Sequence, residues 1–449
     1  MSSITNTGLS GLLAAQAGLG TASRNTANLL TPGYTRQGVL LTPSVFGGGV
    51  SVGAFTRFAD SYKTQQLWSS NSKLGQYSAA ASYYQQLEEV MGMDGASPKA
   101  GIDGFFGALD EVSTDPTNSA LRQQVIAAAD AMAKSYTSVR QVLLHQLDTA
   151  RQQSMASADQ VNSLSSSIAD LNQQIEQAQA KGEAPSELLD QRDQLIDQLS
   201  SLADIQVLRQ SGGAIDISLS NGPPLVIGNQ PGKMRVQSNA DGSFALALEA
   251  AGTTYPLDGA KLGGQLGGIA NYVQDTLQVQ LDANKQLTKE LAERINNQLA
   301  AGYGTNGAPG KPLFDYNDAT GTIAVNPDIT QADLGFSANA DEPGNSDNLH
   351  AVAELRKQHV DLPGVGDVAM GDAYTMLVGM LGSASQLNQA SLDNASTIRE
   401  QASLDWQSVS GISMDEESVS ISEYLNMYNA NMKVISVANE LFQSTLDSL

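Results

Sequence analysis

The chain has 449 residues, enough for about three domains with cores of their own. It carries 47 Asp and Glu against 24 Lys and Arg, and this acidic balance disfavours nucleic-acid binding, which needs basic surface. Cysteine is absent and only three histidines occur, at no metal-ligand spacing, so we expect no disulfide, no bound metal and no cofactor. No apolar run is long enough to predict a membrane-spanning helix.

The first thirty residues predict a helix that is weak by itself. Its larger apolar side chains are Leu9, Leu12, Leu13 and Leu19. Four glycines lie between them, and each glycine in a helix interior costs up to about 1 kcal/mol relative to alanine. We therefore expect a neighbouring element to order this helix. The first Lys or Arg is Arg24, so a cleaved secretory signal is not expected.

A turn is predicted where the first helix ends, at Thr31, Pro32, Gly33 and Tyr34. Pro32 disfavours helical backbone at Thr31, and Gly33 supplies the positive φ that a type II turn requires. Beyond it, residues 39–41 and 50–58 are expected to be extended on either side of three consecutive glycines. This pattern indicates either a hairpin or two arms that are joined flexibly.

Long helices are predicted through the middle of the chain. Helical spacing runs over residues 61–91, over 105–112, from about 118 to 178, and again over 188–202. Gly182 and Pro185 lie between the third and fourth segments and break the helix there, which predicts an antiparallel helical hairpin. Further helices are expected over 269–299, 349–357 and 372–406.

A change of period predicts a small β domain at residues 205–262. Ile215, Ile217 and Leu219 alternate with polar residues, and Phe244 begins a second alternation beyond a turn at Asp241 and Gly242. The predicted fold is mainly α, with a small inserted β domain between long helices.

The last stretch of the chain carries an apolar stripe with a period of seven. One series consists of Ile421, Tyr428, Ile435, Phe442 and Leu449, and the second, four residues later each time, of Leu425, Met432, Asn439 and Leu446. A helix with this stripe needs a partner. The first helix is the candidate, which would pair the two chain ends as a coiled coil, although docking on a globular core of the same chain is the alternative. Asn439 is the single polar member, and buried Asn at such a position fixes register.

Three acids mark the start of this terminal helix. Ser413 and Glu416 have the spacing of a capping box, and Asp415, Glu416 and Glu417 place negative charge in the first turn. The cap explains these residues fully, so we do not expect them to bind a metal.

Motifs at both ends resemble one family. Ser10 to Leu12, Ala27-Asn28 and Thr31 to Gln37 closely resemble the N-terminal signature of bacterial flagellar rod, hook and hook-associated proteins. Asp415 to Glu417, Tyr428 and Ala438 to Leu441 resemble the C-terminal signature of that family. The segment 188–195 resembles its hook–filament junction members, which narrows the comparison to them.

The resemblance implies a structural subunit of the extracellular flagellum at the junction of hook and filament. It implies self-association into a ring, contacts with the hook protein and a second junction protein, and an export chaperone, FlgN, bound at the C-terminal helix. It also implies export in an unfolded state by the flagellar type III apparatus, followed by folding on assembly. No catalytic activity, nucleic acid or membrane span is expected.

Three domains are expected on these grounds. They are a terminal coiled-coil domain of residues 1–60 and 410–449 that lines the inner tube, a helical bundle of 61–204 and 263–409, and the β domain of 205–262. The assembly interface is expected to comprise Leu9, Leu12, Leu13, Leu19, Asn28, Thr31, Pro32, Gly33, Tyr34, Ile421, Leu425, Tyr428, Met432, Ile435, Asn439, Phe442, Leu446 and Leu449. An alternative function is a secreted coiled-coil stalk that presents the β domain as an adhesive module. An enzyme is disfavoured, because no paired carboxylates, Ser-His-Asp set or metal cluster is evident.

Overall fold

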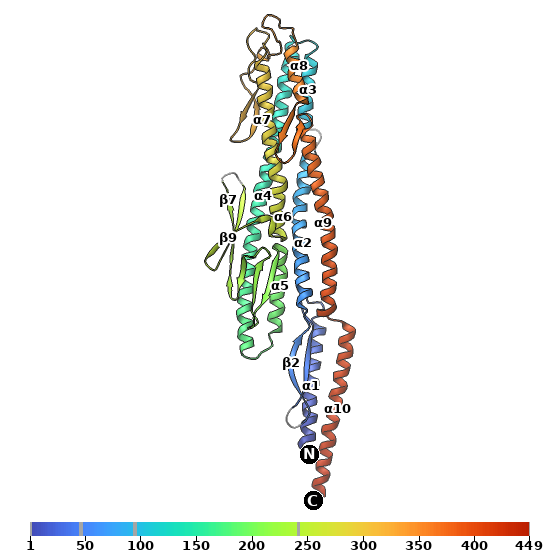
Figure 1. The fold of residues 1–449 in the computed structure, drawn as a ribbon. Helices are drawn as coiled ribbons and strands as arrows, with labels where there is room; N and C mark the ends of the chain where they lie inside the picture. Colours follow the sequence, from blue (N-terminus) through green and yellow to red (C-terminus); the bar gives the residue numbers. More distant parts are fainter. Residues whose placement is uncertain (1, 45–47, 93–96, 240–242, 449) are drawn as a thin grey trace.

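The computed structural model describes residues 2–44, 48–92, 97–239 and 243–448. The chain forms a long rod with both termini at one end (Figure 1). Long helices run along the rod, and small antiparallel sheets lie on its side and near its far end. The prediction of a mainly α fold with some β structure is confirmed.

The terminal part of the rod pairs the two ends of the chain. Helix α1 (Ser2–Ala27) and helix α10 (Met414–Asp447) lie side by side and run in opposite directions (Figure 1). A hairpin of β1 (Gln37–Pro43) and β2 (Val50–Arg57) packs along α1, which confirms the hairpin interpretation of these extended segments. Ser413 caps α10 by accepting a hydrogen bond from the backbone N–H of Glu416 at 3.5 Å.

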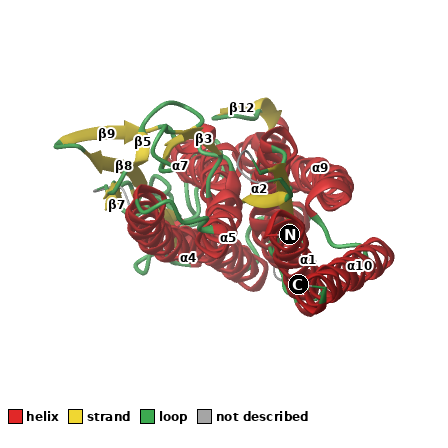
Figure 2. Cartoon of the chain, turned by 90° about the horizontal axis from the view of Figure 1, so that it is seen from below, coloured by secondary structure: helices red, strands yellow, loops and turns green. Residues whose placement is uncertain are grey.

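The middle of the rod is a helical bundle, seen end-on in Figure 2. It contains α2 (Ser61–Met91), α4 (Ser119–Ala180), α5 (Ser186–Leu202) and α9 (Ala373–Ser410). Side-chain caps at Asp60 and Asn118 start α2 and α4. Gly182, with a φ of 79°, allows the chain to reverse between α4 and α5, as predicted.

One predicted helix of the bundle contains an irregular turn. The helix expected over 269–299 consists of α6 (Gly264–Tyr272), a π-helical turn (Val273–Leu277) and α7 (Gln278–Ala300), which continue into one another. The apolar spacing predicted the helix but not the wider turn, because one inserted residue changes the period only locally.

Two small sheets lie against the α4–α5 hairpin. The first has the order β3 (Ile205–Arg209), β4 (Ile215–Leu219), β5 (Pro224–Ile227) and β6 (Gln230–Pro231). The second has the order β7 (Lys233–Ser238), β8 (Phe244–Ala250) and β9 (Thr253–Leu257). Ile215, Ile217 and Leu219 are buried, as their alternation predicted. The predicted turn at Asp241 and Gly242 lies outside the described residues. A 3-10 turn, Gly259–Lys261, leads into α6.

The far end of the rod is built from short elements around the ends of α4, α7 and α9. These are α3 (Pro98–Val112), β10 (Phe314–Asn317), β11 (Thr322–Val325), α8 (Asp347–Glu354), β12 (His359–Leu362) and β13 (Gly366–Ala369), with 3-10 turns at Gln331–Asp333 and Leu355–Lys357. The β12–β13 hairpin was not predicted, because four-residue strands carry too little alternation to be recognised.

Two hydrophobic cores stabilise the rod above the terminal pair. One surrounds Phe105, Tyr136 and Tyr272 and joins the far end to the bundle. The other surrounds Val161 and Leu248 and joins the α4–α5 hairpin to the two sheets. Neither core includes a residue of α1 or α10, so the terminal helices depend on other contacts.

Candidate assembly interface

The terminal helices approach each other through a face of small residues on α1. Gly8, Gly11 and Gly18 are buried on this face. A Cβ atom built on Gly18 would lie 2.4 Å from the ring of Tyr424, and one on Gly11 would lie 2.3 Å from the amide of Asn431. Real Cβ atoms essentially never come within 3.0 Å of a neighbour. The glycines that weaken an isolated α1 are therefore the residues that allow α10 to lie this close.

The face of α10 that meets α1 differs in part from the predicted stripe. Ile421, Tyr428 and Ile435 are half-buried there, as predicted. The residues between them on this face are Tyr424, Asn431 and Ala438, three residues after each member of the first series. The second predicted series follows after four residues and is exposed. Phe442 of the first series is exposed as well, so the expected seam of two series is not formed between α10 and α1 within the chain. Asn439 is exposed and does not set the register of this pair.

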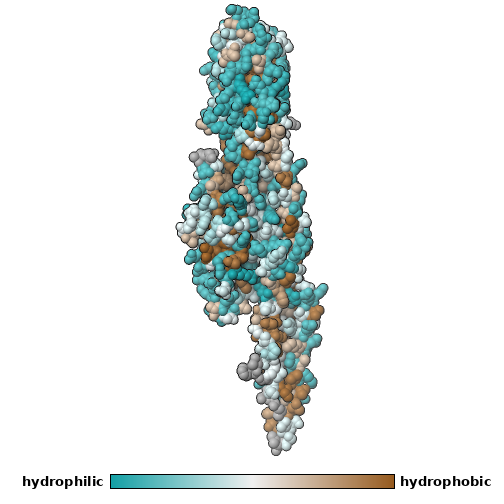
Figure 3. Space-filling model, in the orientation of Figure 1, coloured by the Kyte–Doolittle hydropathy of each residue, from teal (hydrophilic) through white to brown (hydrophobic). Residues whose placement is uncertain are grey.

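A large apolar surface is consequently left uncovered on the terminal pair. It appears as brown patches on the lower tip in Figure 3. Leu425, Met432, Phe442 and Leu446 are each about half exposed. On α1, Leu9 and Leu13 are similarly exposed, whereas Leu12 and Leu19 are half-buried. Leu449 lies outside the described residues.

The predicted turn connects the terminal pair to the bundle. Gly33 has a φ of 74°, the left-handed conformation that its position in the turn required. The hydroxyl of Tyr34 donates to Asn25 Oδ1 at 3.0 Å, and the Asn28 side chain accepts from Thr31 Oγ1 at 3.1 Å. The side-chain amide of Gln194 on α5 donates to the carbonyl oxygen of Pro32. The turn thus holds the end of α1 against the bundle.

Arg36 links the same connection to the start of α10. Its backbone N–H donates to the carbonyl oxygen of Ser410 at 2.9 Å. Its guanidinium donates to Glu417 at 2.8 Å and to Glu416 at 2.5 Å. Glu417 is almost fully buried, so this pair is shielded from solvent on one side. Two of the acids in the first turn of α10 therefore fasten this helix to the first half of the chain.

Arg57 makes a second ionic link, from β2 to α5. Its guanidinium donates to Asp190 at 2.7 Å, to Asp193 at 2.7 Å and to the hydroxyl of Thr35 at 2.8 Å. Burial raises the pKa of Asp190, and the charge of Arg57 acts against that shift. Because Arg57 is largely buried and joins two carboxylates of α5, it ties the terminal segment firmly to the α4–α5 hairpin.

A comparison with known protein families matches the middle of the chain. Residues 84–314 match the family described as flagellar hook-associated protein FlgK helical domain. The chain belongs to the flagellar hook-associated protein FlgK family. Residues 406–448, which span α10, also match the flagellar basal body rod FlgEFG protein C-terminal family.

Curated FlgK-family relatives align with the whole chain. It is 27% identical to flagellar hook-associated protein 1 of Escherichia coli (strain K12), with full coverage of both chains. It is 26% identical to the protein of that name from Bacillus subtilis (strain 168), covering 98% of this chain and 96% of the relative. The first alignment extends over 545 positions against the 449 residues here, so it contains gaps in this chain.

A solved structure has a similar fold. The flagellar hook junction protein FlgK from Burkholderia pseudomallei superposes with a TM-score of 0.64 at 18% identity, covering 77% of this chain and all of that chain. The fold of this FlgK-family chain is therefore shared with a protein solved experimentally.

Arg57, Asp190 and Tyr424 were not predicted to have structural roles. Arg36 and Asp190 belong to motifs on which the family resemblance was based. Those motifs gave no indication of the residues that they contact. The separation of Arg57 and Asp190 by 133 residues leaves no local signal for the pair. Tyr424 was missed because Leu425 fitted the apolar pattern better.

The described part of the chain was also searched for metal and membrane features. Among these residues no group of three or more potential ligands could hold a metal ion. No helix within them is both long and apolar enough to cross a membrane.

Proposed function

We propose that this FlgK-family chain is a structural subunit of the bacterial flagellum that assembles at the junction between hook and filament. The observation that carries the proposal is the incomplete burial of α10. Only Glu417 and Ala438 are buried among the described residues of this 34-residue helix. A helix with so little covered surface gains most of its stability from further partners.

The uncovered surface has the size that assembly needs. Full burial of one large apolar side chain contributes about 1.5–3 kcal/mol, and the six predicted interface residues Leu9, Leu13, Leu425, Met432, Phe442 and Leu446 are each about half exposed. Covering their exposed halves contributes on the order of 5–9 kcal/mol. That is comparable with the cost of about 4–15 kcal/mol for losing free motion on association. The predicted interface residues of α1 and α10 are proposed to make this contact.

Repetition of one such contact around an axis gives a ring or a shallow helix. We propose that copies of the chain associate laterally in this way, with the hook protein on one side of the ring and a second junction protein on the other. The predicted division into terminal, bundle and β domains is part of this proposal, with the terminal pair facing the inner tube.

Export before assembly is the remaining part of the proposal. The chain is held in the cytoplasm by FlgN at α10, leaves the cell unfolded through the flagellar type III apparatus, and folds where it assembles. The exposed apolar residues of α10 give a chaperone a surface to cover. The absence of cysteine is compatible with passage into an oxidising exterior.

The proposed location can be tested by immunoelectron microscopy. A short peptide tag inserted between Asn221 and Gly222 lies in an exposed turn of the outer sheet, away from the terminal pair. We expect gold-labelled antibody to mark a single band at the boundary of hook and filament. Label spread along the filament, or absent from isolated flagella, would contradict the proposal.

A further inference from the structure

The terminal pair and the bundle meet at a joint that has little shared packing. Among the described residues, α1, α10, β1 and β2 pack along one another, and none of them packs along a helix of the bundle. Neither hydrophobic core contains a residue of these four elements. Two short segments outside helix and strand, 58–60 and 411–413, carry the chain across the joint. A small and polar contact between two parts of one chain generally allows them to move relative to each other.

The polar contacts that cross the joint are concentrated on one turn of α5. Arg57 is held by two carboxylates of this turn, and the backbone N–H of Thr35 donates to one of them at 3.4 Å. Gln194 donates from its side-chain amide to the carbonyl oxygen of Pro32. All these partners lie within residues 190–194 of α5, so the terminal segment is attached there at a single place.

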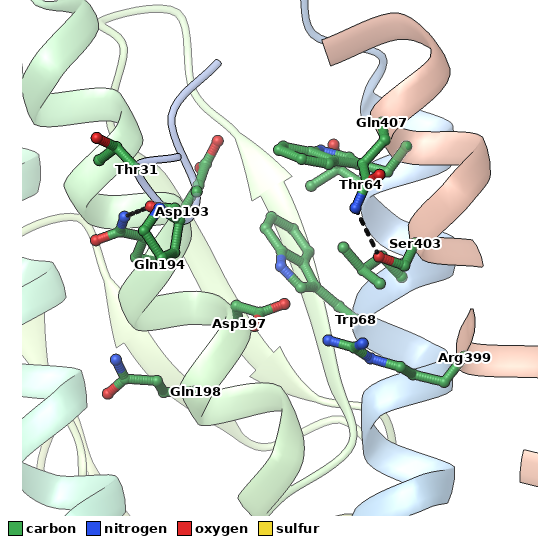
Figure 4. Close-up of a pocket in the computed structure, with 14 residues that line it drawn as sticks. Thr31, Thr64, Trp68, Asp193, Gln194, Asp197, Gln198, Arg399, Ser403 and Gln407 are labelled. Carbon is green, nitrogen blue, oxygen red and sulfur yellow. Dashed lines mark hydrogen bonds between the residues drawn. The ribbon is translucent and has the colours of Figure 1, made fainter. Parts of the chain in front are cut away.

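Unfilled space lies on the opposite side of this attachment. A hollow of about 700 Å³ has the Thr31–Gly33 turn and α5 on one side and α2 and α9 on the other (Figure 4). A second hollow of about 510 Å³ adjoins it, between residues 28–34 and the end of α9, and Trp406 borders both. Protein interiors are normally close-packed, so this space leaves room for movement between the turn and α9.

We propose that the joint is a hinge, at which the terminal pair rotates as one body about its attachment to α5. Rotation toward α9 closes the hollow. Segments 58–60 and 411–413 absorb the change in backbone angles, because hinges usually consist of a few residues at the ends of elements. The helices α1 and α10 and the β1–β2 hairpin move together, since they pack on one another.

This inference rests on the proposed function and concerns how one copy fits its neighbours. In the proposed ring, each copy lies between the hook protein and a second junction protein. A hinge allows the exposed apolar residues of the terminal pair to meet such neighbours while the bundle keeps its own position. Assembly then selects one angle from the range that the free chain samples.

Distances between spin labels test the hinge in the purified full-length chain, which has no cysteine of its own. Lys73→Cys on α2 and Glu423→Cys on α10 place exposed labels on either side of the joint. Double electron–electron resonance should give a distance distribution at least twice as wide for this pair as for two control pairs. Asn6→Cys with Glu423→Cys lies within the terminal pair, and Lys73→Cys with Ser163→Cys lies within the bundle.

A substitution that fills the hollow tests the direction of the movement. Ser403 on α9 lines the hollow, as Figure 4 shows. Ser403→Trp should narrow the distribution across the joint to the width of the controls. The matched change Ser396→Trp, at an exposed position about two turns away on α9, should leave the distribution wide.

The outcomes separate the hinge from the proposed function. A distribution across the joint as narrow as the controls would overturn the hinge, and so would a wide distribution for either control pair, because the two bodies would then not be rigid. An unchanged width in Ser403→Trp would contradict rotation toward α9. These measurements use the free chain, so they decide the hinge independently of where the peptide-tagged chain is found in flagella.

Discussion

The guanidinium of Arg57 lies 2.6 Å from the carboxylate of Asp190, although the two residues are separated by 133 positions in the sequence. Arg57 ends the hairpin beside α1, and Asp190 lies on α5. This pair, with Asp193 and Thr35, fixes the terminal segment to the bundle.

The substitution Arg57→Gln is expected to loosen this connection. It leaves two carboxylates without their cation, and loss of hydrogen bonds to charged groups costs about 1.5–3 kcal/mol each. We expect faster amide hydrogen exchange in β1 and β2, with little change in the upper core. The control Arg235→Gln breaks an exposed pair with Glu249 at 3.0 Å and should cost less than about 1 kcal/mol. Equal effects of the two substitutions would contradict this role.

Two glycines of α1 should respond in opposite directions to the same change. Gly18→Ala places a methyl group 2.4 Å from the Tyr424 ring and should weaken the docking of α10. Gly20→Ala meets no atom closer than 4.0 Å and should stabilise α1 by roughly 0.5–1 kcal/mol through helix propensity. Hydrogen exchange of α10 amides measures both effects. A gain in protection from both changes would show that close approach is not required.

Ile435→Asp and Phe442→Asp should separate pairing from assembly. Ile435 faces α1, where a Cβ built on Gly8 would lie 2.9 Å from it, so a carboxylate there should disrupt the helix pair. Phe442 is about half exposed, so Phe442→Asp should leave the pair intact. Both should reduce FlgN binding and incorporation into flagella. Unchanged chaperone affinity and unchanged motility for both variants would exclude these residues from either contact.

Asp197 should make the stability of the rod depend on pH. Burial raises its pKa from the usual 3.8, although Asn71 and Arg399 act against that shift. A raised carboxyl pKa in the folded state contributes stability that is fully present below pH 3.8 and is lost as pH rises through the folded pKa. The natural chain should therefore lose stability relative to Asp197→Asn as pH rises from 3.5 to 7, measured by urea unfolding.

The substitution Asp258→Asn serves as a control, for which the opposite dependence of stability on pH is expected. A hydrogen bond from Lys261 lowers the pKa of exposed Asp258, so its contribution is present above pH 3.8 and is lost as pH falls. The natural chain should gain stability relative to this variant as pH rises. Identical pH trends for the two substitutions would contradict the assignment of opposite pKa shifts.

Local signals predicted most helices of this fold accurately. The three-and-four spacing of apolar residues indicated the long helices, and Gly182 with Pro185 marked the break between two of them. These features act within a few residues, so the sequence alone contains them. The π-helical turn was missed because one inserted residue hardly changes the apolar period, and the β12–β13 hairpin because its strands are only four residues long.

The terminal interface was predicted only in part, and the reason is different. A period of seven can be divided as three then four or as four then three, and α10 carries suitable residues for both. The structure selects Tyr424, Asn431 and Ala438 because they meet the small face of α1. The exposed series at Leu425 and Met432 remains a prediction for contacts between copies.

The role at the hook–filament junction is tested most directly by electron microscopy of cells from which the gene has been removed. We predict hooks that end without filaments and flagellin released into the medium, with both defects reversed when the natural gene is restored. Filaments of normal length on the hooks of such cells would contradict a structural role at this junction.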